Sequence, residues 1–190
     1  INHGESTQSH HSLPQGVLLH DGFLAYAEGS PYAVVMGTNI GFGVAPLLAD
    51  GALGSIGTWS WSLTDPIHAI SPLAGEDINL HAIGLGEAGD GAIIEIDGAA
   101  TILSTFDLGT GLKSGLAEAN ASVSSIQHGL AGGTTFQLFV GTDRGLFIVD
   151  TASARDEAAG EWRFFYTPET NPIPTDVDEL RSLPLGSNEN

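Results

Sequence analysis

Histidines and carboxylates are the side chains with which this chain could carry out acid–base or metal chemistry. The chain has 7 histidines and 23 acidic residues but no cysteine, which excludes thiolate catalysis and cysteine-ligated zinc. His68, His81 and His128 lie on or beside segments expected to be strands. Such imidazoles either hold a metal ion for hydrolysis or are satisfied by backbone groups within a folded chain.

Other catalytic arrangements are missing from the sequence. No serine lies in the Gly-x-Ser-x-Gly turn of the common hydrolases. Residues 84–89 match the letters of a dinucleotide-binding turn, but they lead into a strand rather than a helix. We therefore predict no catalytic residues.

One group of carboxylates has the chemistry of a calcium site. Glu87, Asp90, Glu95 and Asp97 surround a glycine-rich turn, and hard oxygen ligands suit Ca²⁺. Their spacing is not that of an EF-hand or of a calcium-binding β-roll. We expect a solvated acidic turn and no cofactor, with calcium as the alternative.

The charge balance excludes two classes of partner. Lys and Arg together number 5 against 23 Asp and Glu, which gives a net charge of −18. So acidic a chain repels nucleic-acid phosphates and anionic membrane surfaces. No apolar run approaches the roughly 18 residues of a membrane span, so none is predicted.

The chain reads as one β-rich domain after a short leader. Residues 1–11 are polar and aperiodic, so we expect a flexible leader and a single domain over residues 12–190. Apolar runs of a few residues, rich in Val, Ile and Phe, are broken by Gly, Asp, Asn and Pro, which indicates short strands. Residues 112–120 and 152–160 are expected to be loops or single helical turns.

A strand–turn–strand phrase occurs three times. The clearest copy is residues 136–150, and looser copies are residues 32–44 and 78–97. Their second glycines, Gly41, Gly91 and Gly145, are 50 and 54 residues apart. A period near 50 built from short apolar strands is typical of stacked β-units such as propeller blades.

Further strands flank each phrase. Apolar pairs three residues apart precede the later units: Ile67 and Ile70, Val123 and Ile126, Val177 and Leu180. Aromatic strands follow the phrase, at Trp59–Trp61 and at residues 162–166, and Phe106 is expected in the equivalent place of the middle copy. Each unit therefore reads as four antiparallel strands: an inner strand, a hairpin and an outer aromatic strand.

The residues Leu138-Phe139-Val140-Gly141-Thr142-Asp143-Arg144-Gly145-Leu146-Phe147 resemble the propeller repeats of two-component regulators and of large extracellular microbial proteins. Phe139 stands where those repeats usually have tryptophan. The resemblance implies an all-β, propeller-like fold with about three four-stranded antiparallel blades, plus the start of a fourth. The blades span about residues 12–63, 64–112 and 113–168, and the next blade starts within residues 175–190.

Three blades would leave two open edges, which need a covering partner. We expect either a homo-oligomer or further blades of a longer chain. The function expected is a non-enzymatic binding or scaffold module, of an extracellular or cell-surface sensor type, for a small-molecule or protein ligand. The alternative is a propeller hydrolase of the lactonase or esterase type, with a metal held by His68, His81 or His128 in a central channel.

Three turn residues are the predicted binding site. Asn39, Asp143 and Arg144 occupy the middle of two equivalent turns that should lie on the same rim, where loops carry recognition. In so acidic a chain, the Arg144 guanidinium either anchors a carboxylate or pairs with a neighbouring acid.

Overall fold

The computed structural model describes residues 12–73, 79–108, 111–131, 135–150 and 163–166. Its strands form three four-stranded antiparallel sheets, each a simple meander in chain order. Sheet 1 contains β1 (Leu19–Ala27), β2 (Ser30–Thr38), β3 (Gly41–Pro46) and β4 (Ser60–Leu63). Sheet 2 contains β5 (Ala69–Leu73), β6 (Leu80–Leu85), β7 (Gly91–Ile96) and β8 (Ile102–Asp107). Sheet 3 contains β9 (Val123–Ala131), β10 (Thr135–Thr142), β11 (Leu146–Asp150) and β12 (Arg163–Tyr166). The prediction of a mostly β chain built from antiparallel sheets is confirmed.

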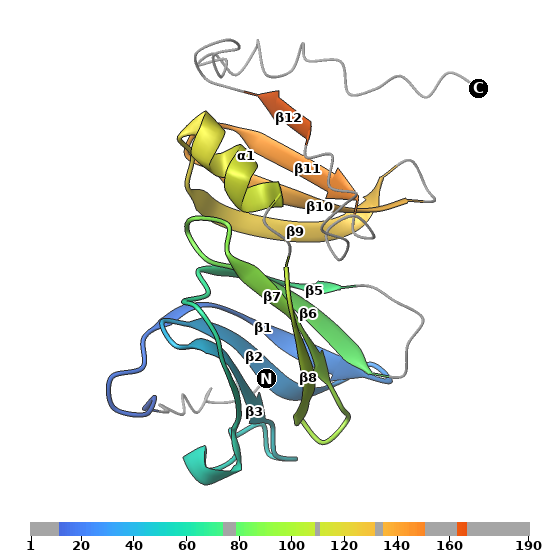
Figure 1. Ribbon diagram of the computed structural model, residues 1–190. Coiled ribbons are helices and arrows are strands. Elements are labelled where there is room, and N and C mark those ends of the chain that lie inside the picture. Colours follow the sequence, from blue (N-terminus) through green and yellow to red (C-terminus); the bar gives the residue numbers. More distant parts are fainter. Residues whose placement is uncertain (1–11, 74–78, 109–110, 132–134, 151–162, 167–190) are drawn as a thin grey trace, which may run out of the picture.

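The three sheets are stacked in chain order, as Figure 1 shows. Sheets 1 and 2 share a buried apolar cluster whose members include Val35, Phe42, Ile67 and Ile94. A second cluster fills the space between sheets 2 and 3, with Ile83 on one side and Val140 on the other. Because side chains alternate between the two faces of a strand, sheet 2 contributes Ile94 to one cluster and Ile93 to the other. Its central strands are therefore buried on both faces.

Neighbouring sheets are also joined at equivalent strands. The first strands lie next to one another, since β1 contacts β5 and β5 contacts β9, and the last strands β4 and β8 are also in contact. Two backbone hydrogen bonds repeat between sheets: the Ile67 amide donates to the Thr38 carbonyl at 2.8 Å, and the Val123 amide donates to the Glu87 carbonyl at 2.9 Å. Each bond connects the chain at the start of one sheet to the hairpin turn of the sheet before it.

The Gly-Thr-x-x-Gly turn is built in the same way in sheets 1 and 3. The Thr38 hydroxyl donates to the Gly41 carbonyl, and the Thr142 hydroxyl donates to the Gly145 carbonyl, both at 2.8 Å. Gly41 has φ +112° and Gly145 has φ +151°, conformations that a side chain would penalise. The motif therefore specifies a hydrogen-bonded hairpin.

The repeat alignment of the middle copy is corrected by the structure. In sheet 2 the hairpin closes with the Gly86 amide donating to the Asp90 carbonyl, so Asp90, not Gly91, corresponds to Gly41 and Gly145. This turn has one residue more than the turns of sheets 1 and 3. Because Asp90 is its closing residue, each residue of β7 lies one position further along its unit than an alignment on Gly91 predicts. Gly91 instead begins β7, opposite Leu85.

The match of Phe106 with the tryptophans is wrong for the same reason. Trp61 lies opposite Gly43 and packs with Met36 on the face of sheet 1 that points away from sheet 2. Phe106 lies opposite Ile93, which belongs to the cluster between sheets 2 and 3. A shift of one residue in a strand moves a side chain to the opposite face.

Residues 111–119 form the helix α1 (Gly111–Ala119), where a loop or a single helical turn was expected. Leu112 and Leu116, one turn apart, are each 1% exposed and join the cluster between sheets 2 and 3. The helix ends at Asn120, which has φ +49°, and the Ala121 amide donates to the Leu116 carbonyl. Burial of two leucines thus stabilises a helix whose formation could not be predicted from the alanine-rich composition alone.

The connection from β3 to β4 covers the outer face of sheet 1. It contains the 3₁₀ turn Ile56–Thr58 and brings Trp59 onto Met36 and Ala45. Trp59 is 7% exposed, and its indole N–H donates to the Gly54 carbonyl at 2.8 Å. Trp59 and its connection therefore cover part of the outer face of sheet 1, at one of the two ends of the stack that were expected to be open.

Three of the predicted segments lie outside the described residues: the leader 1–11, the loop or helical turn 152–160, and the start of a further blade in residues 175–190. Within the described part of the chain, no helix has the length and apolar character needed to cross a membrane.

Candidate functional site

Asn39 in sheet 1 and Asp143 in sheet 3 each hold a hairpin turn to the start of the first strand of their own sheet. The Asn39 carbonyl oxygen Oδ1 accepts the Leu18 amide at 2.7 Å, and its Nδ2 donates to the Gly16 carbonyl at 3.1 Å. Asp143 Oδ1 accepts the Ser122 amide at 2.8 Å. Leu18 and Ser122 directly precede the first strands of sheets 1 and 3. Both predicted binding residues therefore have a local structural task.

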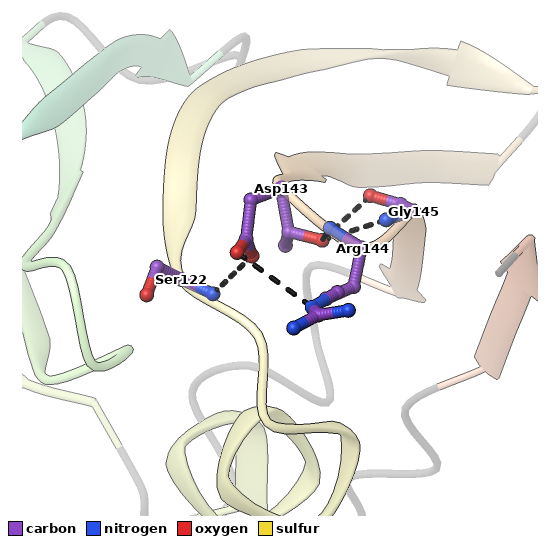
Figure 2. Close-up of polar contacts among 5 residues, drawn as sticks. Ser122, Asp143, Arg144 and Gly145 are labelled. Carbon is purple, nitrogen blue, oxygen red and sulfur yellow. Dashed lines mark hydrogen bonds and ion pairs between the residues drawn. The ribbon is translucent and has the colours of Figure 1, made fainter. Parts of the chain in front are cut away.

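Arg144 lies beside Asp143 at the same turn (Figure 2). Its Nε is 3.8 Å from Asp143 Oδ2, and the two side chains are 42% and 56% exposed. Its amide and that of Gly145 donate to the Thr142 hydroxyl. The structure thus brings Asp143 and Arg144 together as an exposed ion pair, while Asn39 occupies the corresponding turn of sheet 1.

Of the four carboxylates predicted as alternative calcium ligands, Asp90, Asp97 and Glu95 have separate surroundings. Asp90 pairs with the Lys113 ammonium at 2.5 Å, and Asp97 accepts the amides of Ala99 and Thr101 within its own turn. Glu95 lies at the far end of β7 from the Asp90 turn. Across the described ranges, no three or more His, Asp and Glu side chains are grouped closely enough to hold a metal ion.

The three histidines weighed as metal ligands lie on different elements. His68 precedes β5 and stacks on His20, with ring centroids 4.2 Å apart and planes 13° from parallel. His81 lies on β6, opposite Glu95. His128 lies on β9 and is 7% exposed, and this burial lowers the pKa of its imidazole. Its backbone amide donates to the Ser71 hydroxyl at 3.0 Å, which links β9 to β5.

An acidic hollow of about 460 Å³ lies where sheets 1 and 2 meet at the hairpin end. Asp65, Asp90 and Asp107 line it together with Lys113. The hydrogen bond and the charge of Asp90 raise the pKa of the Lys113 ammonium, and Asp65 adds to this effect. The lysine is therefore held in its charged form and is unsuited to act as a nucleophilic amine. The occurrence of a single lysine in an acidic sequence is the feature from which an ion pair of Lys113 could have been predicted.

A second hollow, of about 350 Å³, lies on the face of sheet 2 toward sheet 3. It is lined by His81, Ile93, Glu95, Phe106, Asp107 and Leu108. The Glu95 carboxylate accepts hydrogen bonds from Asn79 at 2.7 Å and from Ser104 at 2.9 Å. These two bonds, and the nearby His81, lower the pKa of Glu95. Sequence reasoning singled out Glu95 and His81 separately but could not pair them, because the pairing depends on strand register.

Comparison with known proteins adds no functional assignment to this geometry: the chain matches no protein-family model, and no curated protein is similar to it.

Proposed function

We propose that the chain is a set of propeller blades that serves as a non-enzymatic binding or scaffold module. The observation that supports this most strongly is the order of contacts between sheets. The first strands of neighbouring sheets are in contact, the last strands β4 and β8 of sheets 1 and 2 are in contact, and the middle sheet, sheet 2, is buried on both faces. Sheets that stack in this fan-like way are the building units of propellers.

The proposal includes a further blade on the face of sheet 3 that points away from sheet 2. Phe139 occupies the position, three residues before the hairpin turn, that Val35 has in sheet 1 and Ile83 has in sheet 2. Val35 and Ile83 are fully buried by the next sheet, whereas Phe139 is only half-buried. Ile148, which pairs with Phe139 across the hairpin, is half-buried too. Two large apolar side chains are thus available at the position where each earlier sheet receives the next one.

The sequence offers a candidate for the first strand of that blade. Val177 and Leu180 have the spacing of Ile67 and Ile70, whose methyl groups lie against Gly37 of sheet 1. The residue that corresponds to Gly37 in sheet 3 is Gly141, since each directly precedes the threonine of its turn. We therefore propose that Leu180 packs near Gly141, either in the same chain or in a second copy.

Cysteine pairs can test this proposal directly, because the chain has no cysteine of its own. Gly141→Cys combined with Leu180→Cys is expected to form a disulfide under mild oxidation. Gly37→Cys with Ile70→Cys is the positive comparison, and Gly141→Cys with Leu103→Cys is the negative one. A cross-linked monomer places the further strand in the same chain, and a cross-linked dimer places it in a second copy. Failure of the Gly141/Leu180 pair while the Gly37/Ile70 pair cross-links would contradict the further blade.

The hydrolase alternative has less support. His68, His81 and His128 belong to separate elements, and the described residues offer no group of three metal-ligating side chains. The turn residues Asn39 and Asp143 are engaged in holding the sheets. We therefore expect ligand recognition in the hollows between sheets rather than catalysis at a metal.

A further inference from the structure

The hollow around Glu95 differs from a solvated acidic surface because polar and apolar residues lie side by side in it. It has a floor made of two adjacent cross-strand rows on one face of sheet 2. One row is polar and joins His81, Glu95 and Ser104, which lie directly opposite one another on β6, β7 and β8. The next row is apolar and includes Ile93 opposite Phe106. A charged row beside an apolar row makes the hollow amphipathic.

The carboxylate in this hollow is held in one orientation. Asn79 Nδ2 donates to Glu95 Oε1, and the Ser104 hydroxyl donates to Glu95 Oε2. Each oxygen of the carboxylate thus has a donor, and each keeps further capacity to accept a hydrogen bond. An acceptor that is already oriented loses less side-chain freedom when a ligand binds.

The apolar part of the hollow is suited to a hydrocarbon or aromatic group. Ile93 is 1% exposed and forms a fixed wall, and Leu108 packs against the same cluster. Phe106 is 55% exposed, although it borders the hollow. An aromatic ring next to a carboxylate is the combination that attracts an organic cation, through the face of the ring and through charge.

The charge of the lining favours a cation as well. Glu95 and Asp107 both line the hollow, none of its lining residues is a lysine or arginine, and His81 is the one lining residue that can carry a positive charge. The other acidic hollow differs in this respect, because Lys113 already provides an ammonium beside Asp90. The lining of the hollow around Glu95 contains no ammonium group, so this hollow keeps room for the ammonium of a ligand.

We propose that this hollow binds a small primary ammonium ion that carries an aromatic or aliphatic group, with the ammonium at Glu95 and the apolar group against the pair Ile93 and Phe106. This inference deepens the proposed binding function and rests on it, but it does not depend on the further blade. A hollow of about 350 Å³ is at the small end of the range for ligand sites, which suits a ligand of this size.

The test uses 2-phenylethylammonium as the probe, with 2-phenylethanol and phenylacetate as neutral and anionic analogues of similar shape. Binding to the whole chain is followed by NMR shift changes of the Ile93 methyl groups and the Ser104 amide at pH 8. The ammonium is expected to bind at least about tenfold more tightly than the alcohol, and phenylacetate is expected not to bind.

Variants then assign the contacts. Glu95→Gln keeps the shape of the side chain and is expected to weaken binding of the ammonium at least about fivefold. Phe106→Leu is expected to weaken it about threefold, through loss of the ring. Glu118→Gln removes the same charge from the exposed surface of α1 and is expected to leave affinity unchanged. Thermal unfolding shows whether each variant remains folded.

Three results would overturn the inference. The first is absence of shift changes with the ammonium up to about 10 mM in the folded protein, beyond which affinity is negligible. The second is equal affinity for the ammonium and the alcohol. The third is an equal effect of Glu95→Gln and Glu118→Gln, which would show general attraction to an acidic surface. None of these results bears on the cross-linking test, so the two proposals can fail separately.

Discussion

Asn39 and Asp143 make the same contact in two different sheets: each accepts, through Oδ1, the amide of the residue directly before the first strand of its own sheet. The backbone of each residue repeats the connection, because the Asn39 amide donates to the Leu18 carbonyl and the Asp143 amide donates to the Ser122 carbonyl. The variable middle position of the turn thus selects a short side chain with an acceptor oxygen. This relationship explains why residues that resembled a recognition site in the sequence serve the fold.

Asp143 substitutions can separate hydrogen bonding from charge. Asp143→Ala is expected to lower the free energy of unfolding by about 1 kcal/mol, because the Ser122 amide loses its acceptor. Asp143→Asn keeps the acceptor and copies sheet 1, so its loss is expected to be less than half as large. Urea unfolding at pH 7 measures both. Equal losses for the two variants would show that charge, rather than the acceptor, is what matters at this turn.

Gly37 allows sheets 1 and 2 to approach closely. A Cβ atom at this position would lie 2.8 Å from Cγ2 of Ile67 and 2.9 Å from Cγ2 of Ile70. Gly37→Ala is therefore expected to lower the free energy of unfolding by about 1–3 kcal/mol through overpacking. Gly57→Ala is the matched control, since no atom lies within 4 Å of a Cβ there. Similar values for both variants would contradict the close contact between the sheets.

Burial of His128 predicts a loss of stability in mild acid. Its pKa is lowered in the folded chain, so the unfolded chain takes up a proton first as the pH falls. Stability is unaffected above the ordinary histidine pKa of about 6.5 and falls as the pH drops from there toward the lowered value. His128→Gln should remove this contribution, so the stability difference between the native chain and the variant should shift in favour of the variant from pH 7 to pH 5. A constant difference across that range would show that His128 does not titrate in this way.

Helix α1 contributes to the core through Leu116. Leu116→Ala is expected to lower the free energy of unfolding by about 2–4 kcal/mol, because the side chain is 1% exposed and lies among the apolar residues between sheets 2 and 3. Glu118→Ala, on the exposed side of the same helix, is expected to change it by less than about 0.5 kcal/mol. Guanidinium unfolding measures both. A small effect of Leu116→Ala would mean that the helix does not pack between the sheets.

The fold could be predicted from the sequence at positions where a residue type has one structural role. The Gly-Thr-x-x-Gly turn requires a glycine with positive φ and a threonine hydroxyl, so the hairpins at Gly41 and Gly145 could be predicted together with their flanking strands. The middle copy was misaligned because glycines occur on both sides of its turn, and only the hydrogen bond from Gly86 to Asp90 identifies the closing pair. That single-residue shift also placed Phe106 on the wrong face.

The candidate site was less accessible from sequence for a physical reason. Asn39, Asp143 and Arg144 were chosen because turn residues are exposed, but exposure says nothing about hydrogen bonds to a strand start over 20 residues away in the chain. The hollow around Glu95 depends on the pairing of three strands, which brings His81 and Ser104 to either side of Glu95. Helix α1 was likewise decided by tertiary burial of Leu112 and Leu116 rather than by local propensity.

The sheets stack in chain order with their first strands side by side, and NOEs between methyl groups report this stacking. NOEs are expected from Ile70 to sheet 1 methyl groups such as those of Val35, and from Ile126 to sheet 2 methyl groups such as those of Ile83. No NOE is expected between Val35 of sheet 1 and Val140 of sheet 3, because sheet 2 separates them. Direct NOEs between the methyl groups of Val35 and Val140, or none between Ile70 and sheet 1, would contradict the stacking and with it the proposed blade module.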